Sequence, residues 1–461
     1  MEAVLLIDIG STYTKVTAVD IAGECVVGTA KAHTTVCTDI QEGLEKAMDR
    51  LREKTGIGSY SGKLACSSAA GGLKMVAVGL VPGLTSEAAK MAALSAGAKV
   101  LKTYSYELSE GETEEIAGLK PDIILLTGGT DGGNRKVLLH NADRIAGIKG
   151  DFPVIAAGNK SAADDACRIL AKGGKEVLLC ENVMPEFNVL NIEPAREMIR
   201  RVFLQRIIRA KGLTKVQALV EDILMPTPSA VLRAASLLSK GCGTEKGLGE
   251  LLVADVGGAT TDIYSISDGS PASSGIFLKG LPEPFEKRTV EGDLGVRYSA
   301  GALMEAAGAD AVAARAGLTA GELADAAARI ASRPDLLAFG TDRIGRLDHA
   351  LASLAVKLGV ERHAGRIGST WSAFGEVFVQ TGKDLGRVAR VVGTGGPVIH
   401  AVDPKGILKE ALFDETRPEI LKPRKAEFLL DQKYILAAMG LLGGRYPEIA
   451  VKIMKRELEM I

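Results

Sequence analysis

The chain has 461 residues, of which 46% are hydrophobic and 25% are charged, proportions typical of a folded globular protein with two or more domains. Its 56 basic and 57 acidic residues give a formal net charge of −1, so bulk charge predicts no nucleic-acid partner. No apolar stretch reaches the roughly 18 residues that a membrane span needs, and the opening residues MEAVLLIDIG lack the basic flank of a signal peptide. The six cysteines form no CxxC pair, which argues against a zinc or iron–sulfur site within one chain and favours reduced thiols in the cytoplasm.

Strands and helices alternate through the first half of the chain. Residues 3–23 read as strand, glycine turn and strand, and residues 39–54 have the apolar spacing of an amphipathic helix. Further strands are expected at 63–67, 73–80, 121–127 and from 153, with helices at 85–97 and 134–146. This alternation predicts a mixed or parallel sheet covered by helices.

Residues 193–211 predict a helix that is rich in arginine. Ile199, Phe203, Ile207 and Ala210 share one face, and arginines cover much of the remainder. The sequence leaves two interpretations open, a solvated helix face and a docking surface for an acidic partner.

The second half repeats features of the first. Residues 250–266 again read as strand, glycine turn and strand, and 389–401 as a buried strand with a glycine turn. An alanine-rich helical region is expected at about 299–332, and the least regular segment at about 402–425. IDIGSTYTK resembles ADVGGATTD, and LLTGGTDGG resembles VVGTGGPV, so we expect two copies of one fold.

The two acidic glycine turns suggest a phosphate site. Backbone N–H groups in a turn rich in Gly, Ser and Thr can converge on an anion. A carboxylate beside phosphate requires a cation, so Asp8 and Asp255 are expected to hold Mg²⁺, through waters, while the two turns face each other across a cleft. The alternative for either turn alone is a simple hairpin. No GxxxxGK[ST] motif is present, and no GxGxxG opens a helix after the first strand.

Nearly the whole chain resembles the actin, sugar kinase and heat-shock chaperone ATPase superfamily. Residues 7–15 and 253–262 match its two phosphate motifs, 391–398 its adenosine motif, and 225–241 and 434–444 its two connecting helices. The resemblance implies an α/β fold of two ribonuclease-H-like lobes around a nucleotide cleft. It places the first lobe at 1–224, the connecting helix region at 225–249, the second lobe at 250–433 and the second connecting helix with the tail at 434–461.

Within that superfamily the chain is most similar to the GlmL/MutL family, accessory proteins of adenosylcobalamin-dependent glutamate mutase. Residues 66–89, 122–134, 180–196 and 288–297 carry this resemblance. It implies an ATP-binding, ATP-hydrolysing protein that reactivates such a mutase, with ATP and Mg²⁺ as cofactors. The expected partner is the mutase, which would carry the cobalamin, and the expected location is cytoplasmic. No nucleic-acid or membrane partner is implied, and a homodimer stays open.

The resemblance also assigns roles to single residues. It places Asp8, Asp255 and Thr260 in catalysis, with the two aspartates organising Mg²⁺ and the attacking water. The phosphate contacts it implies are Gly10, Ser11, Thr12 and Tyr13 in the first turn and Gly257, Gly258 and Thr260 in the second. It places Gly393, Gly395 and Gly396 against adenosine, and residues 291–295 near the ribose. One position departs from the pattern, since Met225 stands where the heat-shock ATPases carry an acid, which leaves open whether ATP is hydrolysed or only bound.

Three other functions stay open on the sequence. A small-molecule kinase of the same fold could use Asp255 as its base. An activator could pass an electron through an iron–sulfur cluster shared by two subunits and ligated by Cys66 or Cys180. A nucleotide-binding scaffold without turnover is the third. Which mutase is served, and which surface docks it, are not decided by the sequence.

Overall fold

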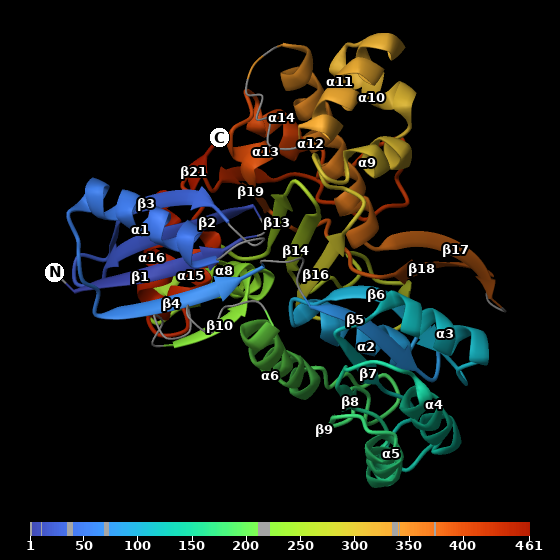
Figure 1. Cartoon of the computed structure of the whole chain (residues 1–461). Coiled ribbons are helices and arrows are strands. Elements are labelled where there is room, and N and C mark those ends of the chain that lie inside the picture. The colour runs from blue at the N-terminus through green and yellow to red at the C-terminus, as the bar shows by residue number, and fades with distance from the viewer. Residues whose placement is uncertain are drawn as a thin grey trace. The chain divides into compact units, whose positions relative to one another are not determined.

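The computed structural model describes residues 2–10, 12–34, 40–68, 73–210, 222–333, 340, 342–372 and 375–461. The chain divides into two compact units, the first formed by Met1–Val231 with Gly280–Pro282 and the second by Leu232–Lys279 with Glu283–Ile461 (Figure 1). The boundary therefore falls inside one helix, α8 (Thr227–Lys240).

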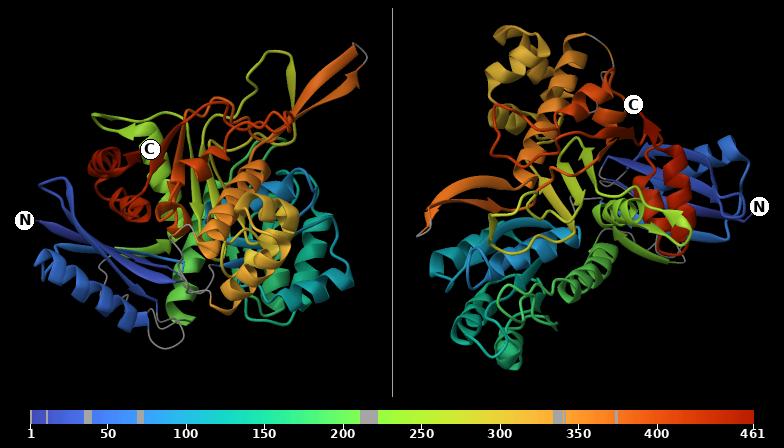
Figure 2. Two further views of the ribbon diagram at one scale, coloured as in Figure 1. Left: turned by 90° about the horizontal axis from the view of Figure 1, so that it is seen from above. Right: turned by 180° about the vertical axis from the view of Figure 1, so that it is seen from behind.

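The first unit opens with a five-stranded sheet in the order β10-β4-β1-β2-β3. Its strands are β1 (Ala3–Ile9), β2 (Tyr13–Asp20), β3 (Cys25–His33), β4 (Gly62–Ser67) and β10 (Asp222–Pro226). β1, β2 and β3 pair antiparallel, whereas β4 is parallel to β1 and β10 is parallel to β4. The expected amphipathic helix is α1 (Ile40–Thr55), which packs across β2 and β3 with Leu44, Ala47 and Leu51 fully buried (Figure 2).

The second unit contains a sheet with the same plan, in the order β16-β14-β13-β19-β20-β21. Its strands are β13 (Leu251–Val256), β14 (Thr261–Ile266), β16 (Glu286–Glu291), β19 (Arg390–Thr394), β20 (Glu427–Leu430) and β21 (Glu459–Met460). β13, β14 and β16 pair antiparallel, and β19 and β20 continue the sheet in parallel, as β4 and β10 do in the first unit. The prediction of two copies of one ribonuclease-H-like α/β fold is confirmed.

One pairing inside that prediction is wrong. The strand before LLTGGTDGG is β7 (Ile123–Leu126), which lies in a different sheet, so it is not the counterpart of β19. The counterpart is β4, since β4 and β19 each lie parallel to the first strand of an acidic hairpin. A buried apolar run followed by glycines marks the end of many parallel strands, so the pattern alone could not identify the sheet.

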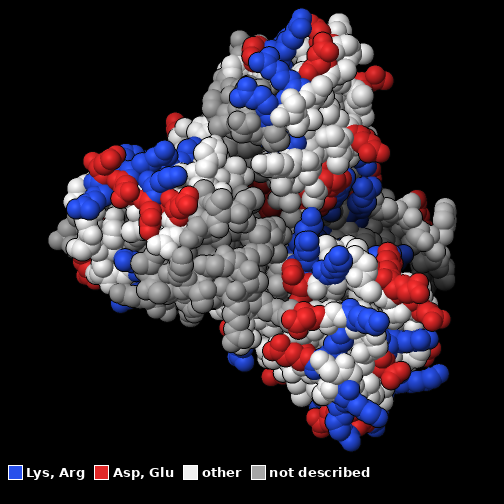
Figure 3. Space-filling view, viewed as in Figure 1, with Lys and Arg blue, Asp and Glu red and all other residues white. Residues whose placement is uncertain are grey.

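β7 is the central strand of a five-stranded, fully parallel sheet within the first unit, in the order β6-β5-β7-β8-β9. The other strands are β5 (Lys74–Gly79), β6 (Lys99–Ser105), β8 (Val154–Ala156) and β9 (Val177–Leu179), and the associated helices are α2 (Thr85–Ser95), α3 (Glu110–Leu119), α4 (Lys136–Gly147), α5 (Lys160–Lys172) and α6 (Glu193–Ala210). Acidic and basic side chains are interspersed on the visible face of this region (Figure 3), and pairs such as Arg135–Asp165 join them.

The arginine-rich helix is α6. Ala195, Ile199, Val202 and Phe203 bury its apolar face in the core of the first unit. The side chains of residues 206–210 lie outside the described part, and so does the expected contribution of Ile207 and Ala210. The buried face confirms the helix and its amphipathic pattern, while the docking role of its arginines stays a prediction.

The second unit adds helices and a projecting sheet. The expected alanine-rich helical region forms α9 (Ala300–Ala307), α10 (Ala309–Ala316) and α11 (Ala320–Ser332), which pack with α12 (Arg343–His363). Further elements are α13 (Gly396–Ile399), α14 (Pro404–Lys409), α15 (Leu436–Leu442), α16 (Pro447–Glu457), and the short strands β11 (Gly241–Cys242) and β12 (Glu245–Lys246). The segment expected to be least regular holds the short helix α14. β15 (Ile276–Lys279), β17 (Arg366–Ser372) and β18 (Gly375–Thr381) form a separate three-stranded sheet. No helix among the described residues is long and apolar enough to cross a bilayer.

Candidate functional site: two acidic glycine turns

The first acidic turn joins β1 to β2. The N–H of Gly10 donates to the carbonyl of Tyr13 at 3.0 Å, and Asp8 lies directly opposite Lys15 in the ladder. A Cβ on Gly10 would lie 2.7 Å from that carbonyl oxygen, so the turn itself requires glycine. Ser11, an expected phosphate contact, lies outside the described residues.

Asp8 is buried, with polar partners on both carboxylate oxygens. Oδ1 accepts a hydrogen bond from the Thr227 hydroxyl at 2.7 Å and a weak one from the Cys66 thiol at 3.5 Å. Oδ2 accepts from Lys15 Nζ at 3.3 Å. Thr227 is the first residue of α8, and the sequence assigns it no role. The buried Met225, which stands where related ATPases carry an acid, lies two residues earlier.

Thr12 and Tyr13 occupy the rest of the first turn. Thr12 is exposed, and its carbonyl accepts the N–H of Thr34 at 2.9 Å. The half-buried Tyr13 ring stacks at 4.4 Å, between ring centroids, on the exposed imidazole of His33. No acceptor for the N–H of Thr12 lies among the described residues, so this donor is available to a ligand.

The second acidic turn joins β13 to β14 and has the same geometry. The N–H of Gly257 donates to the carbonyl of Thr260 at 2.9 Å, and Asp255 lies opposite Asp262. Asp262 is held by the buried Arg288, whose Nε donates to Oδ1 at 2.8 Å. Asp262 is therefore committed to an ion pair in the protein, and Asp255 is the acid of this turn that the sequence assigns to Mg²⁺.

The segment after β16 supports the second turn from its carbonyl side. The N–H of Val296 donates to Gly257, those of Arg297 and Tyr298 donate to Gly258, and the Ser299 hydroxyl donates to Ala259, at 2.7 to 3.1 Å. Residues 291–295, expected near the ribose, precede these donors directly.

The N–H groups of the same turn have no such partners. Within the described residues we find no acceptor for the N–H of Gly258, Ala259 or Thr260, all of which are half-buried. Three successive backbone N–H groups without an acceptor among the described residues are available to an anion such as phosphate. The Thr260 hydroxyl is occupied, since it donates to Asp262 Oδ2 at 3.2 Å.

Arg297 is a further supporting residue that the sequence did not suggest. Both terminal nitrogens of its guanidinium bind Asp348 on α12, at 2.6 and 2.5 Å, in a bidentate pair that is largely buried. The ion pair fixes Arg297 to α12, in the core of the second unit. The backbone N–H of Arg297, which donates to the Gly258 carbonyl, is thereby held in place.

The third glycine cluster follows β19, and its glycines are explained mainly by the protein. Gly395 has φ +93°, and a Cβ there would lie 2.1 Å from the carbonyl oxygen of Val256. A Cβ on Gly393 would collide with Leu408 at 2.8 Å, whereas nothing lies within 4 Å of one on Gly396. The backbone therefore requires glycine at 395, a Cβ at 393 would need the Leu408 side chain to move, and of these three glycines only Gly396 is open to a ligand.

A buried carboxylate holds this third cluster in place. Asp431 accepts the N–H groups of Ile435 and Leu436 at the start of α15, and its Oδ2 accepts the Thr394 hydroxyl at 3.0 Å. The start of α15 is thereby tied to the end of β19. Asp431 carries no motif of its own and could not be found from the sequence.

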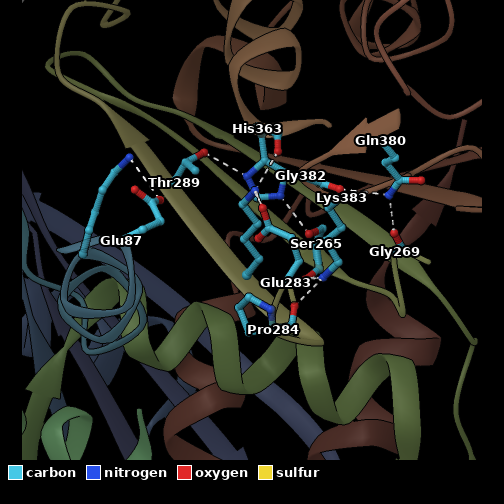
Figure 4. Close-up of polar contacts among 12 residues, drawn as sticks. Glu87, Ser265, Gly269, Glu283, Pro284, Thr289, His363, Gln380, Gly382 and Lys383 are labelled. Atoms are coloured by element: carbon cyan, nitrogen blue, oxygen red, sulfur yellow. Dashed lines mark hydrogen bonds and ion pairs between the residues drawn. The ribbon is translucent and has the colours of Figure 1, made fainter. Parts of the chain in front are cut away.

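A buried polar network fixes the strands behind the second turn (Figure 4). His363, at the end of α12, contacts the Thr289 hydroxyl through Nδ1 at 2.9 Å and the Ser265 hydroxyl through Nε2 at 2.8 Å. Burial, followed by the nearby Lys287 and Lys383, holds the pKa of His363 well below its usual value. Lys383 donates to the carbonyls of Pro284 and Phe285, both at 2.8 Å, and burial, followed by Lys287, lowers its pKa to about 7.

The residues present fit a magnesium ion that arrives with its nucleotide. Among the described residues, no group of three or more His, Cys, Asp or Glu side chains could hold a metal ion. Mg²⁺ in nucleotide sites keeps several waters and uses one or two carboxylates together with substrate phosphates. Each turn, taken by itself, offers one aspartate close in sequence to at least one backbone N–H group that has no acceptor among the described residues, which is the combination that such an ion uses together with its phosphates.

The two cysteines that the sequence names for a shared cluster lie in different surroundings. Cys66 is fully buried, and burial, followed by Asp8, raises the pKa of its thiol. Burial, followed by Glu181, raises the pKa of the half-buried Cys180 to about 12.

Comparison with known proteins identifies the family. Residues 4–458 match the family model described as MutL protein. The chain belongs to the MutL protein family. A curated relative, "Protein MutL" of Clostridium tetanomorphum, is 48% identical over 464 residues, which cover 99% of each chain.

Two solved structures show a distant likeness to this MutL-family chain. An activator of the 2-hydroxyisocaproyl-CoA dehydratase from Clostridium difficile, solved with bound ADPNP, matches 100% of this chain and 99% of its own, at 10% identity and a TM-score of 0.32. A ligand-bound xylulose kinase from Lactobacillus acidophilus matches 100% and 93%, at 12% identity and a TM-score of 0.35.

Proposed function

We propose that this MutL-family chain binds Mg-ATP at its two acidic glycine turns and uses it to reactivate an adenosylcobalamin-dependent mutase of the glutamate mutase type. The observation that carries the nucleotide part is the second turn. Its carbonyls are taken by residues 296–299, while the N–H groups of Gly258, Ala259 and Thr260 have no acceptor among the described residues. Its geometry repeats in the turn that follows Asp8.

In this proposal the roles are divided between backbone and carboxylates. The N–H groups of the second turn and of Thr12 bind phosphate oxygens, and Asp8 and Asp255 hold Mg²⁺ through waters. When the nucleotide is bound, Lys15 exchanges its ion pair with Asp8 for contacts with the phosphates. Its cationic Nζ can form charge-assisted hydrogen bonds with phosphate oxygens as it does with the carboxylate. Gly396, which has open space around it, is the glycine of the third cluster that can contact the adenosine.

The link to the mutase rests on family membership and on the coupling that such a protein requires. ATP can change the grip on a partner only if it binds two arrangements of the protein with different affinity. The lobes expected at 1–224 and 250–433, joined through residues 225–249, are the elements we propose to rearrange. The effect on the mutase would be the release of damaged cobalamin and the loading of intact cofactor, with the corrinoid site on the mutase.

Calorimetry tests the nucleotide part. Titration of the full chain with Mg-ATP should give one site, and Asp8→Asn or Asp255→Asn should weaken it about 10-fold or more, equivalent to about 1.4 kcal/mol. Asp325→Asn, which removes an exposed acid on α11, is the matched control and should bind like the parent. Equal affinity in all four proteins would refute the assignment.

Reactivation tests the mutase part. A partner mutase is first inactivated by turnover, and then receives this protein, Mg-ATP and fresh adenosylcobalamin. Activity should return with the parent and with Asp325→Asn, but not with Asp255→Asn. Equal recovery without ATP would reduce the protein to a scaffold, and transfer of phosphate to a small acceptor would favour the kinase function instead.

A further inference from the structure

The three-stranded sheet of the second unit exposes large apolar side chains. β15 is parallel to β18, and β17 is antiparallel to β18. Trp371, the single tryptophan of the chain, is 80% exposed, and Leu278 and Phe378 are each more than half exposed. Soluble proteins rarely leave such a group of side chains in water unless it serves an interaction.

These side chains share one face. Residues paired in a ladder point to the same side of a sheet, and successive residues alternate. Phe378 pairs with Ser369 and Ile276, Trp371 with Glu376, and Leu278 with Gln380, which is two residues from Phe378. Trp371, Phe378, Ile276 and Leu278 therefore form one apolar stripe across the sheet. On the same face, the small Ser369 lies beside Phe378 at the β17 edge, and Glu376 lies beside Trp371.

The strand that carries Trp371 is also an open edge. β17 pairs with β18 on one side. On the other side, backbone pairing among the described residues is confined to its first two residues: the N–H of Ile367 donates to the carbonyl of Glu419 at 2.8 Å, and Arg366 forms a β-bridge with Ile420. Since N–H directions alternate along a strand, Ser369 and Trp371 also point their backbone groups away from β18.

The β17 edge lacks the features that normally prevent an edge strand from pairing with another chain. Gly368–Ser372 contains no charged residue and no proline, and the β17–β18 register runs without a bulge. The opposite edge, β15, is only four residues long and ends in Lys279. One edge of the sheet is therefore protected, and the other is suited to accept a strand.

We propose that the free edge of β17 pairs antiparallel with β17 of a second copy of this chain, about a twofold axis at Thr370. Ser369 then exchanges backbone hydrogen bonds with Trp371 of the other copy, because these are the two residues whose backbone groups face outward. The indole lies over the small Ser369 of the other copy and reaches toward its Phe378, so the two stripes become one.

The absence of charge from Gly368–Ser372 removes the main electrostatic obstacle to pairing with a second copy. An isologous contact repeats each residue on both sides, so a charge inside the segment would oppose its own copy. Gly368–Ser372 is neutral, and its nearest basic neighbour, Arg366, lies 4.0 Å from Glu419 of its own chain. The contact is small, which predicts a dissociation constant in the range of about 1 to 100 µM. The proposal does not depend on the proposed ATP function.

Cross-linking of cysteine variants tests the axis. Thr370 faces its own copy in a non-hydrogen-bonded pair, at about 4.5 Å between Cα atoms, a distance that a disulfide can span. Thr370→Cys should therefore give a disulfide-linked dimer on mild oxidation. Ser372→Cys is the matched control on the same strand and face, and its copy would lie about 14 Å away. It should give no more dimer than the parent chain with its native cysteines.

Sedimentation velocity tests the pairing itself. Ser369→Pro removes a donor that faces outward and leaves the β17–β18 ladder complete, so it should abolish the dimer, whereas Ser369→Ala should keep it. The fluorescence of Trp371 should shift to shorter wavelength as the parent dimerises. A parent that stays monomeric up to about 200 µM, a dimer insensitive to Ser369→Pro, or equal cross-linking at residues 370 and 372 would overturn the proposal. A shift of the Trp371 emission only when the mutase is added would assign the face to that partner instead.

Discussion

The hydroxyl of Thr227 donates a 2.7 Å hydrogen bond to Oδ1 of Asp8, across 219 residues of sequence. It joins the first turn of α8 to the end of β1, and the acid it holds is the one that the sequence assigns to Mg²⁺. Hydrogen bonds to ionised groups stabilise more than neutral ones. The helix in which the unit boundary falls is therefore tied to the acid of the first turn.

Thr227→Val should lower the free energy of unfolding by about 1.5 kcal/mol, because it removes this donor while keeping the side-chain shape. Thr227→Ser keeps the hydroxyl and should stay within about 0.5 kcal/mol of the parent. Urea denaturation measures both. Equal stability of the valine and serine variants would show that the bond is not formed in solution.

Gly395 and Gly258 should respond differently to alanine. At Gly395 the positive φ and the Val256 carbonyl oppose a Cβ, so Gly395→Ala should destabilise by about 3 kcal/mol or more. At Gly258 the nearest atom to a Cβ is Cβ of Arg297 at 3.5 Å, an ordinary contact, so Gly258→Ala should fold normally. Circular dichroism melts compare the two.

Gly258→Val tests whether the nucleotide lies close to this backbone. Because the space around Gly258 admits a Cβ, the variant should keep its fold and lose ATP affinity through a clash with the nucleotide. Unchanged ATP affinity in the folded variant would exclude a close approach there.

Asp348→Asn should weaken the second turn through Arg297. The largely buried guanidinium loses its charged partner, so we expect a stability loss of about 2 kcal/mol and an Mg-ATP affinity about 10-fold lower. Arg315, on the surface of α10, pairs with Glu410, and Glu410→Gln is the matched control for loss of a more exposed ion pair. Normal ATP binding in a stable Asp348→Asn protein would separate Arg297 from the site.

Lys383 should make stability depend on pH above neutrality. Its pKa falls to about 7 in the folded chain from 10.5, so between these values the unfolded chain binds more protons and the free energy of unfolding rises with pH. The slope contributed by this group approaches about 1.4 kcal/mol per pH unit. Lys383→Met should flatten the profile over that window in urea denaturation at pH 7 to 10. An unchanged slope would mean that Lys383 stays protonated inside the protein.

Several features could be predicted from the sequence because they depend on neighbours along the chain. The turns after Asp8 and Asp255, the strands on each side of them, the amphipathic helix α1 and the helical region that became α9 to α11 follow from local pattern and glycine placement. The internal repeat was visible for the same reason, since each copy of the hairpin is continuous in sequence.

Tertiary structure alone decided which distant residues meet. Thr227 reaches Asp8, Asp431 reaches Thr394, and residues 296–299 take the carbonyls of the second turn, although the sequence assigns none of these partners a role in the site. The assignment of LLTGGTDGG to the repeat failed because a buried strand with a glycine turn looks the same in either sheet until its ladder partners are known. Local sequence sets backbone conformation through short-range sterics and hydrogen bonding, whereas the partner of a strand or a buried carboxylate is chosen by packing between segments far apart in the chain.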